Sequence, residues 1–188
     1  MAHGVAIVEV DGADTRMILA DSANHRCPTW APDGKRFVVS ANTSQQSALV
    51  EVSIHGETTK VLVASDSTIL DCPQWSPDGR SILYTVGHGG LEYLPRPDHE
   101  ILMDLHILDL ATGASRAITS GPGMNNYGRW ARDSRWIVFQ SDRHASPFTD
   151  TLALAHFLDS LEIYVIRADG SALRRITTNT YFDAHPSW

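Results

Sequence analysis

The chain has 188 residues, a length that suits one domain with a substantial core. Its 15 lysines and arginines against 22 aspartates and glutamates give a net charge of −7, which argues against a broad electrostatic grip on nucleic acid or anionic lipid. The charge therefore predicts no nucleic-acid partner. No stretch reaches the roughly 18 apolar residues that cross a bilayer, so we also expect no membrane span. The start of the chain also lacks the pattern of an export signal.

A tryptophan-to-turn motif recurs along the chain. The segment 30–35 (WAPDGK) returns at 75–80 (WSPDGR) and, in altered form, at 130–135 (WARDSR). A fourth copy starts with His185-Pro186-Ser187-Trp188. The motif marks a core unit of about 45 residues with variable insertions.

The first complete repeat shows the expected strands, a to d, in order. Strand a ends at Trp30, and Pro-Asp-Gly at 32–34 reverses the chain. The apolar run 36–40 predicts strand b, buried on both faces, as in the interior of a propeller. The half-alternating run 48–54 predicts strand c, nearer the rim. A glycine turn and a run led by basic residues, 56–63, supply strand d.

The next two repeats follow the same order. Strand b is expected at 81–85 and 136–140, strand c at 104–110 and 162–167, and strand d at 113–119 and 170–177, with a further d-type run at 12–19. In the third repeat Arg132 and Ser134 replace proline and glycine, so we expect an altered turn between strands a and b.

These repeats predict an all-β fold, a β-propeller of four-stranded antiparallel blades occupying one domain, residues 1–188. About four blades are expected, three complete and one split between the ends; the units are 21–64, 65–120 and 121–178, with partial units at 1–20 and 179–188. The ends supply strands a, c and d but no b, so closure within one chain is expected to be defective. Either the chain is a piece of a longer propeller, or a second copy completes the ring as a homodimer, which we favour.

The motif at 75–80, with 162–165 (EIYV), 169–171 (DGS) and 174–177 (RRIT), resembles the WD40-like, or PD40, repeat of TolB-like β-propeller proteins. The resemblance covers nearly the whole chain and implies the fold. That family includes periplasmic interaction proteins and propeller domains of prolyl-oligopeptidase-type peptidases, so the resemblance leaves the function open. The resemblance suggests a periplasmic location, whereas the lack of an export signal in the sequence suggests a cytoplasmic one. The compartment therefore stays open.

The irregular segments fall on one face of the predicted propeller. Insertions at 87–103 and 142–161 connect strands b and c, and the d-to-a connections lie on the same side; such variable loops commonly carry function. Seven candidate binding residues stand three or five positions before a tryptophan: His25, Cys27, Cys72, Asn125, Tyr127, Asp183 and His185. We expect them near the mouth of the central channel, where they either satisfy backbone groups or bind a small ligand or a peptide end.

Metal binding is not expected at these positions. His25, Asp183 and His185 have suitable atoms but lie in separate repeats without a local ligand motif. Cys27 and Cys72 occupy equivalent places in neighbouring blades, and we expect them as small buried thiols. The sequence therefore predicts no metal and no cofactor.

The second insertion predicts a short amphipathic helix. Leu154, Phe157, Leu158 and Leu161 fall at helical spacing after the capping residues Thr149 and Asp150. The helix is expected either to pack as a flap on its own blade or to offer a partner or self-association surface. Phe157 is therefore an eighth candidate binding residue.

The sequence contains no catalytic motif that we recognise. There is no Gly-x-Ser-x-Gly nucleophile elbow and no α/β pattern that could present a catalytic serine. We therefore expect a non-catalytic scaffold that binds a protein, a peptide or a small ligand. The alternatives are the propeller domain of a prolyl-oligopeptidase-type peptidase without its catalytic domain, or a metal-dependent enzyme at the channel mouth, which depends only on scattered histidines.

Overall fold

The computed structural model describes residues 4–88, 102–121, 123–144, 161–179, 181 and 183–188. All regular structure in these ranges is β-strand, and no helix among them is long and apolar enough to cross a membrane. The helix predicted around Phe157 lies outside the described residues. The strands are β1 (Val5–Val8), β2 (Thr15–Leu19), β3 (Asn24–Trp30), β4 (Arg36–Asn42), β5 (Ser47–Ser53), β6 (Thr58–Ser65), β7 (Ile69–Trp75), β8 (Ser81–Gly87), β9 (Met103–Asp109), β10 (Ser115–Ala117), β11 (Asn126–Trp130), β12 (Trp136–Ser141), β13 (Glu162–Arg167) and β14 (Arg174–Arg175).

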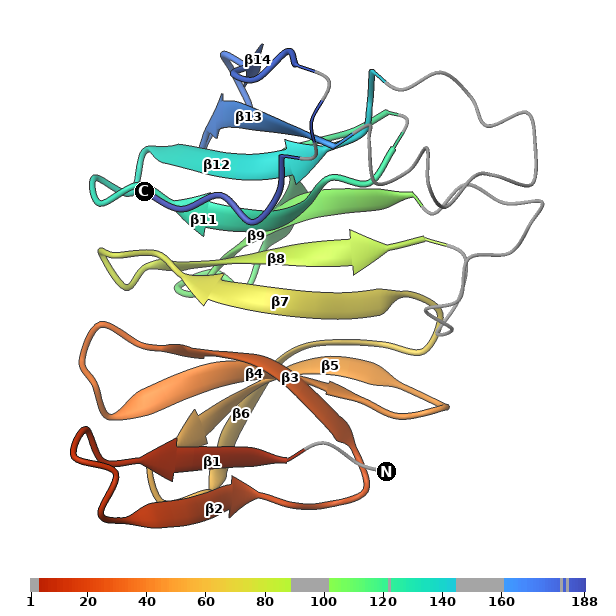
Figure 1. The fold of residues 1–188 in the computed structure, drawn as a ribbon. Helices are drawn as coiled ribbons and strands as arrows, with labels where there is room; N and C mark the ends of the chain where they lie inside the picture. Colours follow the sequence, from red (N-terminus) through yellow and green to blue (C-terminus); the bar gives the residue numbers. More distant parts are fainter. Residues whose placement is uncertain (1–3, 89–101, 122, 145–160, 180, 182) are drawn as a thin grey trace.

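The strands form consecutive antiparallel sheets stacked along the chain, which confirms the predicted propeller blades (Figure 1). Strands β3–β6, β7–β10 and β11–β14 make three four-stranded sheets, each in sequence order, and β1 pairs with β2 in a two-stranded sheet. We refer to the four-stranded sheets as blades one, two and three. The sheets do not close into a ring within the described part of the chain.

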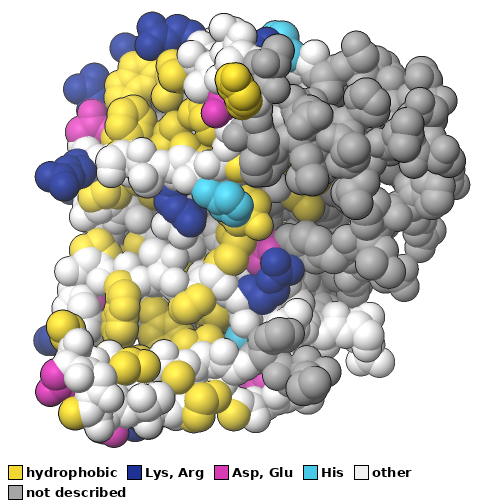
Figure 2. Space-filling model, in the orientation of Figure 1, with side chains coloured by type: hydrophobic (Ala, Val, Ile, Leu, Met, Phe, Trp, Pro, Cys, Tyr) yellow, Lys and Arg dark blue, Asp and Glu magenta, His cyan; other side chains and the backbone are white. Residues whose placement is uncertain are grey.

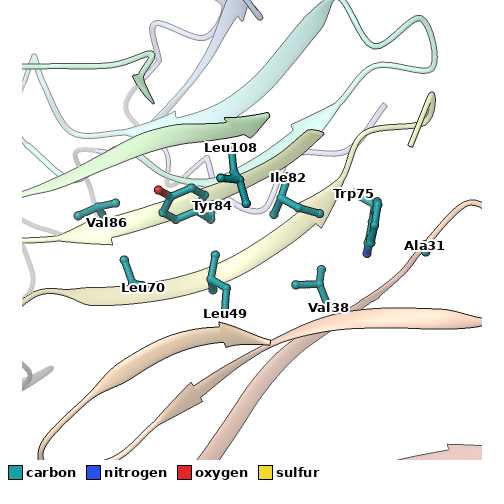
Figure 3. Packing of buried hydrophobic residues seen from close by; sticks show 9 residues of the cluster. All are labelled: Ala31, Val38, Leu49, Leu70, Trp75, Ile82, Tyr84, Val86 and Leu108. Atoms are coloured by element: carbon teal, nitrogen blue, oxygen red, sulfur yellow. The ribbon is translucent and has the colours of Figure 1, made fainter. Parts of the chain in front are cut away.

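The core lies between the blades, because strand b is apolar on both faces. In β8, Ile82, Tyr84 and Val86 pack toward blade one, whereas Leu83 packs toward blade three. Figure 3 shows Val38 and Leu49 of blade one facing Ile82 and Tyr84 across the first of these interfaces. The prediction that strand b is buried on both faces is therefore confirmed, since β4 is buried from Phe37 to Ser40.

Strand c of blade one is more deeply buried than its half-alternating sequence predicts. All residues of β5 from Ser47 to Val52 are buried, although their half-alternating pattern predicted a strand nearer the rim. The reason is that β5 has a neighbour on each side: Ala48, Val50 and Val52 pack with the β1–β2 sheet, and Leu49 packs with blade two.

The turn between β11 and β12 keeps the geometry of the other two, so the expected alteration is wrong. The Ser134 N–H donates to the carbonyl of Ala131 at 3.0 Å, as the Gly34 N–H does to Ala31 at 3.0 Å. Ser134 takes the left-handed φ of 57° that glycine normally supplies. Asp133 accepts the Arg135 N–H at 2.9 Å and stabilises this turn as Asp33 stabilises the first.

Two tryptophans of the repeated motif donate a hydrogen bond to the preceding repeat, whereas the buried Trp75 indole N–H has no hydrogen-bond partner among the described residues. The Trp130 indole N–H donates to the carbonyl of Gln74 at 3.4 Å, and the Trp188 indole N–H donates to the carbonyl of Arg129 at 3.1 Å. Segment 183–188 lies beside β11, where the final strand a was predicted (Figure 1), but it does not form a regular strand, which corrects that prediction. These two bonds join the strand-a positions of consecutive repeats.

Candidate binding face

The third residue before each tryptophan has the same unusual backbone conformation. Cys27, Cys72, Tyr127 and His185 have φ values of 51°, 46°, 50° and 52°, in the left-handed region that costs a non-glycine residue roughly 1–2 kcal/mol. The pairing of strands a and b shifts register at this point in all three blades. The four positions aligned by counting back from the tryptophan are therefore structurally equivalent.

These four side chains contact one another in pairs across neighbouring repeats. Cys27 and Cys72 form a disulfide, with Cα atoms 4.8 Å apart, so the prediction of free thiols is wrong. The rings of Tyr127 and His185 meet edge to face with centroids 4.4 Å apart. The left-handed kink directs each side chain toward its counterpart in the adjoining repeat, which makes this line of positions the seam between blades.

Two of the candidates five positions before a tryptophan, His25 and Asp183, bond to side chains four residues earlier in the chain. His25 is buried, and its Nε2 lies 2.7 Å from Oδ1 of Asp21. Asp183 accepts a hydrogen bond from the Asn179 amide at 2.8 Å. These two candidates therefore bond to residues of their own segments, and the binding role of all seven described candidates stays a prediction.

Asn125 is the candidate that lies at the centre of a larger polar network. It is fully buried, and its amide nitrogen donates to the carbonyl of Met103 at 2.9 Å and to Asp104 at 3.2 Å. Its amide oxygen accepts from the Ser141 hydroxyl at 2.8 Å and from the Arg143 guanidinium at 2.6 Å. Asn125 thereby helps to hold the guanidinium of Arg143 in place.

Arg143 is held by aromatic rings as well as by hydrogen bonds. Its guanidinium carbon lies 5.5 Å from the ring centroid of Tyr164 and 5.9 Å from that of Phe139, within cation–π range. Partial burial lowers the pKa of Arg143 from its usual value, yet an arginine stays charged at neutral pH. The Tyr164 hydroxyl also lies 2.6 Å from Nδ1 of His144, so a cation and a titratable imidazole share this site.

A second imidazole approaches the network from blade two. Nε2 of His88 lies 3.5 Å from Oδ2 of Asp104, whose Oδ1 accepts from the Thr119 hydroxyl at 2.9 Å. Burial lowers the pKa of the neighbouring His106. The His88 side chain is 45% exposed.

We call the set Asp104, Asn125, Arg143, His88 and His144 the polar cluster. Its members come from the ends of β8 and β12, the start of β9 and the connection that enters β11, which all lie on the side of the b–c and d–a loops (Figure 1). Sequence reasoning found Asn125 but missed Arg143. The polar run 140–144 (QSDRH), at the end of the buried strand β12, was the signal available.

The opposite face is built from repeated, self-satisfied turns. Asp78 accepts the Arg80 N–H at 3.0 Å, and in the turns between strands c and d Asp109 accepts the Thr112 N–H at 2.8 Å and Asp169 the Ser171 N–H at 2.8 Å. The backbone hydrogen bond from Thr112 lowers the pKa of Asp109. The carboxylates of this face therefore serve their own turns, unlike the members of the polar cluster.

One group of possible metal donors occurs among the described residues. The sulfurs of Cys27 and Cys72 and a carboxylate oxygen of Asp71 lie within 4.8 Å of one another. The histidines His25 and His185 and the carboxylate of Asp183, which were considered for a metal from the sequence, do not belong to this group.

Comparisons with known proteins agree with the β-propeller fold predicted from the repeats. A sequence profile of the TolB beta propeller domain matches residues 2–155. Uncharacterized protein Atu1656 of Agrobacterium fabrum is 27% identical over 224 residues, covering all of this chain and 70% of that protein. Among solved structures, TolB from Acinetobacter baumannii superposes with a TM-score of 0.73 at 22% identity, over 95% of this chain and 38% of TolB.

An enzyme shares the same architecture. Oligogalacturonate lyase from Vibrio parahaemolyticus superposes with a TM-score of 0.59 at 16% identity, over 95% of this chain and 48% of the lyase. At these identities the solved structures establish the fold alone. The chain spans less than half the length of either solved structure.

Proposed function

Since the chain belongs to the TolB β-propeller domain family, we propose that it is a non-catalytic binding module. Its binding surface is the face that carries the b–c and d–a loops, and its ligand is a protein segment, a peptide or a small polar molecule. The observation that supports this proposal is the difference between the two faces. The polar cluster combines an arginine, a carboxylate, an amide and two histidines on one face, whereas the carboxylates of the other cap their own turns.

Arg143 is the group in the cluster best suited to anchor a ligand. Two of its nitrogens bond to Ser141 and Asn125, and the Tyr164 ring lies within cation–π range, so the side chain loses little further entropy on binding. A hydrogen bond to a charged group contributes about 1.5–3 kcal/mol. An acceptor on the ligand, such as a carboxylate or a peptide carbonyl, fits this donor.

Replacing Arg143 with glutamine is expected to weaken ligand binding by roughly 10- to 100-fold, the equivalent of one charged hydrogen bond. Peptides selected from a random phage-displayed library on the full chain would serve as probes, with affinities measured by calorimetry. Arg80→Gln, on the exposed turn of the opposite face, is the matched control and should leave the affinity unchanged.

The same experiment tests the absence of catalysis. Selected peptides should be recovered intact by mass spectrometry after long incubation with the chain. Peptides whose affinity depends on Arg80 rather than on Arg143 would contradict the proposed surface. Cleavage of bound peptide, or release of unsaturated products from oligogalacturonate with manganese present, would favour the peptidase or lyase alternative.

Self-association through the β1–β2 sheet is also part of the proposal. Within the described residues β1 pairs with β2 alone, and hydrophobic side chains are exposed over this sheet (Figure 2). Val8 is 54% and Met17 is 58% exposed. An edge of this kind offers unpaired backbone groups to another strand, and a second copy of the chain is the occupant that we propose.

Sedimentation velocity at micromolar concentration is expected to show a dimer. Val8→Lys should shift the protein toward monomer, because it places a charge on the proposed contact, whereas Val61→Lys, at a similarly exposed position of β6, should not. A strict monomer for the unmodified chain would remove this part of the proposal and leave the binding face untouched.

A further inference from the structure

The seam between blades one and two carries a carboxylate beside its two sulfurs. Asp71 precedes Cys72 in β7, its side chain is only 2% exposed, and an oxygen of it lies within 4.8 Å of both sulfurs. Two sulfurs and one oxygen from neighbouring blades therefore converge on one point. We propose that Cys27, Cys72 and Asp71 bind a zinc ion when the disulfide is reduced.

The donor types suit zinc. Zinc binds thiolate sulfur at about 2.3 Å and carboxylate oxygen at about 2.0–2.2 Å, and three protein ligands leave a fourth, tetrahedral position for water. Sulfur donors also select zinc over magnesium and calcium, which prefer oxygen. With Cα atoms 4.8 Å apart, rotation of the two cysteine side chains separates the sulfurs to accommodate an ion while the strands keep their places.

The surroundings orient the carboxylate and balance the charge. The Ser40 hydroxyl donates to Oδ1 of Asp71 at 2.8 Å, the kind of support that ligating carboxylates receive from a second layer of residues. Nη1 of Arg26 lies 3.6 Å from Oδ2. Two thiolates and one carboxylate carry three negative charges, which the zinc ion and the guanidinium neutralise.

The chemistry divides into two balanced steps. A phosphine or dithiol reductant supplies two electrons, the sulfur–sulfur bond breaks, and each sulfur takes a proton; a phosphine is oxidised to its oxide with an oxygen from water. Zinc then displaces the two thiol protons into solvent and bonds to both sulfurs and to Asp71. The disulfide and the zinc site are therefore alternative links between the same two blades.

Cobalt is the probe for this site, because cobalt–thiolate bonds absorb in the near ultraviolet. The full chain would be reduced with a phosphine, freed of reductant without air, and titrated with Co²⁺. We expect one equivalent to bind with thiolate absorption and zinc to displace it, whereas the oxidised chain of identical sequence shows none. Zinc should also raise the melting temperature of the reduced chain and leave that of the oxidised chain unchanged.

Two variants assign the ligands. Cys27→Ser should abolish the thiolate absorption of the bound stoichiometric ion, and Asp71→Asn should weaken binding by at least about tenfold. Glu57→Gln, which removes an exposed carboxylate outside both this site and the polar cluster, is the control and should bind cobalt as the unmodified chain does. Absence of cobalt binding to the reduced chain, equal binding by the oxidised chain or by Cys27→Ser, or a reduced chain that unfolds and does not refold with zinc would each overturn the proposal.

Discussion

Replacing both Cys27 and Cys72 with serine is expected to lower the free energy of unfolding by about 2–4 kcal/mol. The disulfide joins positions 45 residues apart and so removes much of the freedom of the unfolded chain between them. It also ties blade one directly to blade two. Since a domain of this size is stabilised by only about 5–15 kcal/mol, the change is a substantial share of the total.

Urea unfolding followed by tryptophan fluorescence would measure this loss, with the midpoint falling in the double variant. Chemical reduction of the unmodified chain without metal should lower the midpoint by a similar amount, which separates the loss of the bond from any effect of the serines. Coinciding unfolding curves for the oxidised and reduced chains would show that the bond contributes nothing to stability.

Phe139→Ala is expected to cost about 3–5 kcal/mol, the usual range for emptying a buried aromatic position. Phe139 is fully buried between blades two and three, and its ring stacks on Tyr164 with centroids 5.6 Å apart. The same ring lies beneath the guanidinium of Arg143. The substitution should therefore weaken both the blade interface and the binding of selected peptides.

Thermal and urea unfolding check the stability, and Tyr181→Ala is the matched control. Tyr181 is 76% exposed, and loss of its ring should change the free energy of unfolding by less than about 0.5 kcal/mol. Phe139→Leu keeps most of the buried volume and should retain much of the stability while losing the ring beneath Arg143. Equal stability of Phe139→Ala and the unmodified chain would contradict the described core.

The fold could be predicted because its information is local and repeated. Trp30, Trp75 and Trp130 each precede a turn and a short apolar run, and that order alone places strands a and b of every blade. Counting back from the tryptophan also identified Cys27 and Cys72 as equivalent. Their state could not be predicted, because it depends on the left-handed backbone that turns the two side chains toward each other.

The turn at Ser134 and the polar cluster show where the sequence carries less information. A serine at a glycine position suggests a changed turn, yet the hydrogen bonds around Ser134 hold it in the same left-handed conformation. Arg143 bonds to Asn125, and Asn125 bonds to Asp104 of blade two, because strand ends of two blades converge; no short spacing in the sequence predicts these contacts. A hydrogen-bond network built from several segments can be identified only from the three-dimensional structure.

The alternation along strand b means that each blade interface has its own set of side chains. Leu83 belongs to one interface and Tyr84, the next residue, belongs to the other, so adjacent substitutions in β8 would perturb different boundaries. Contacts of this kind couple nearest neighbours only, as in a linear array of units. Blades could therefore diverge one boundary at a time, and a loop on one blade can lengthen without requiring any change two blades away.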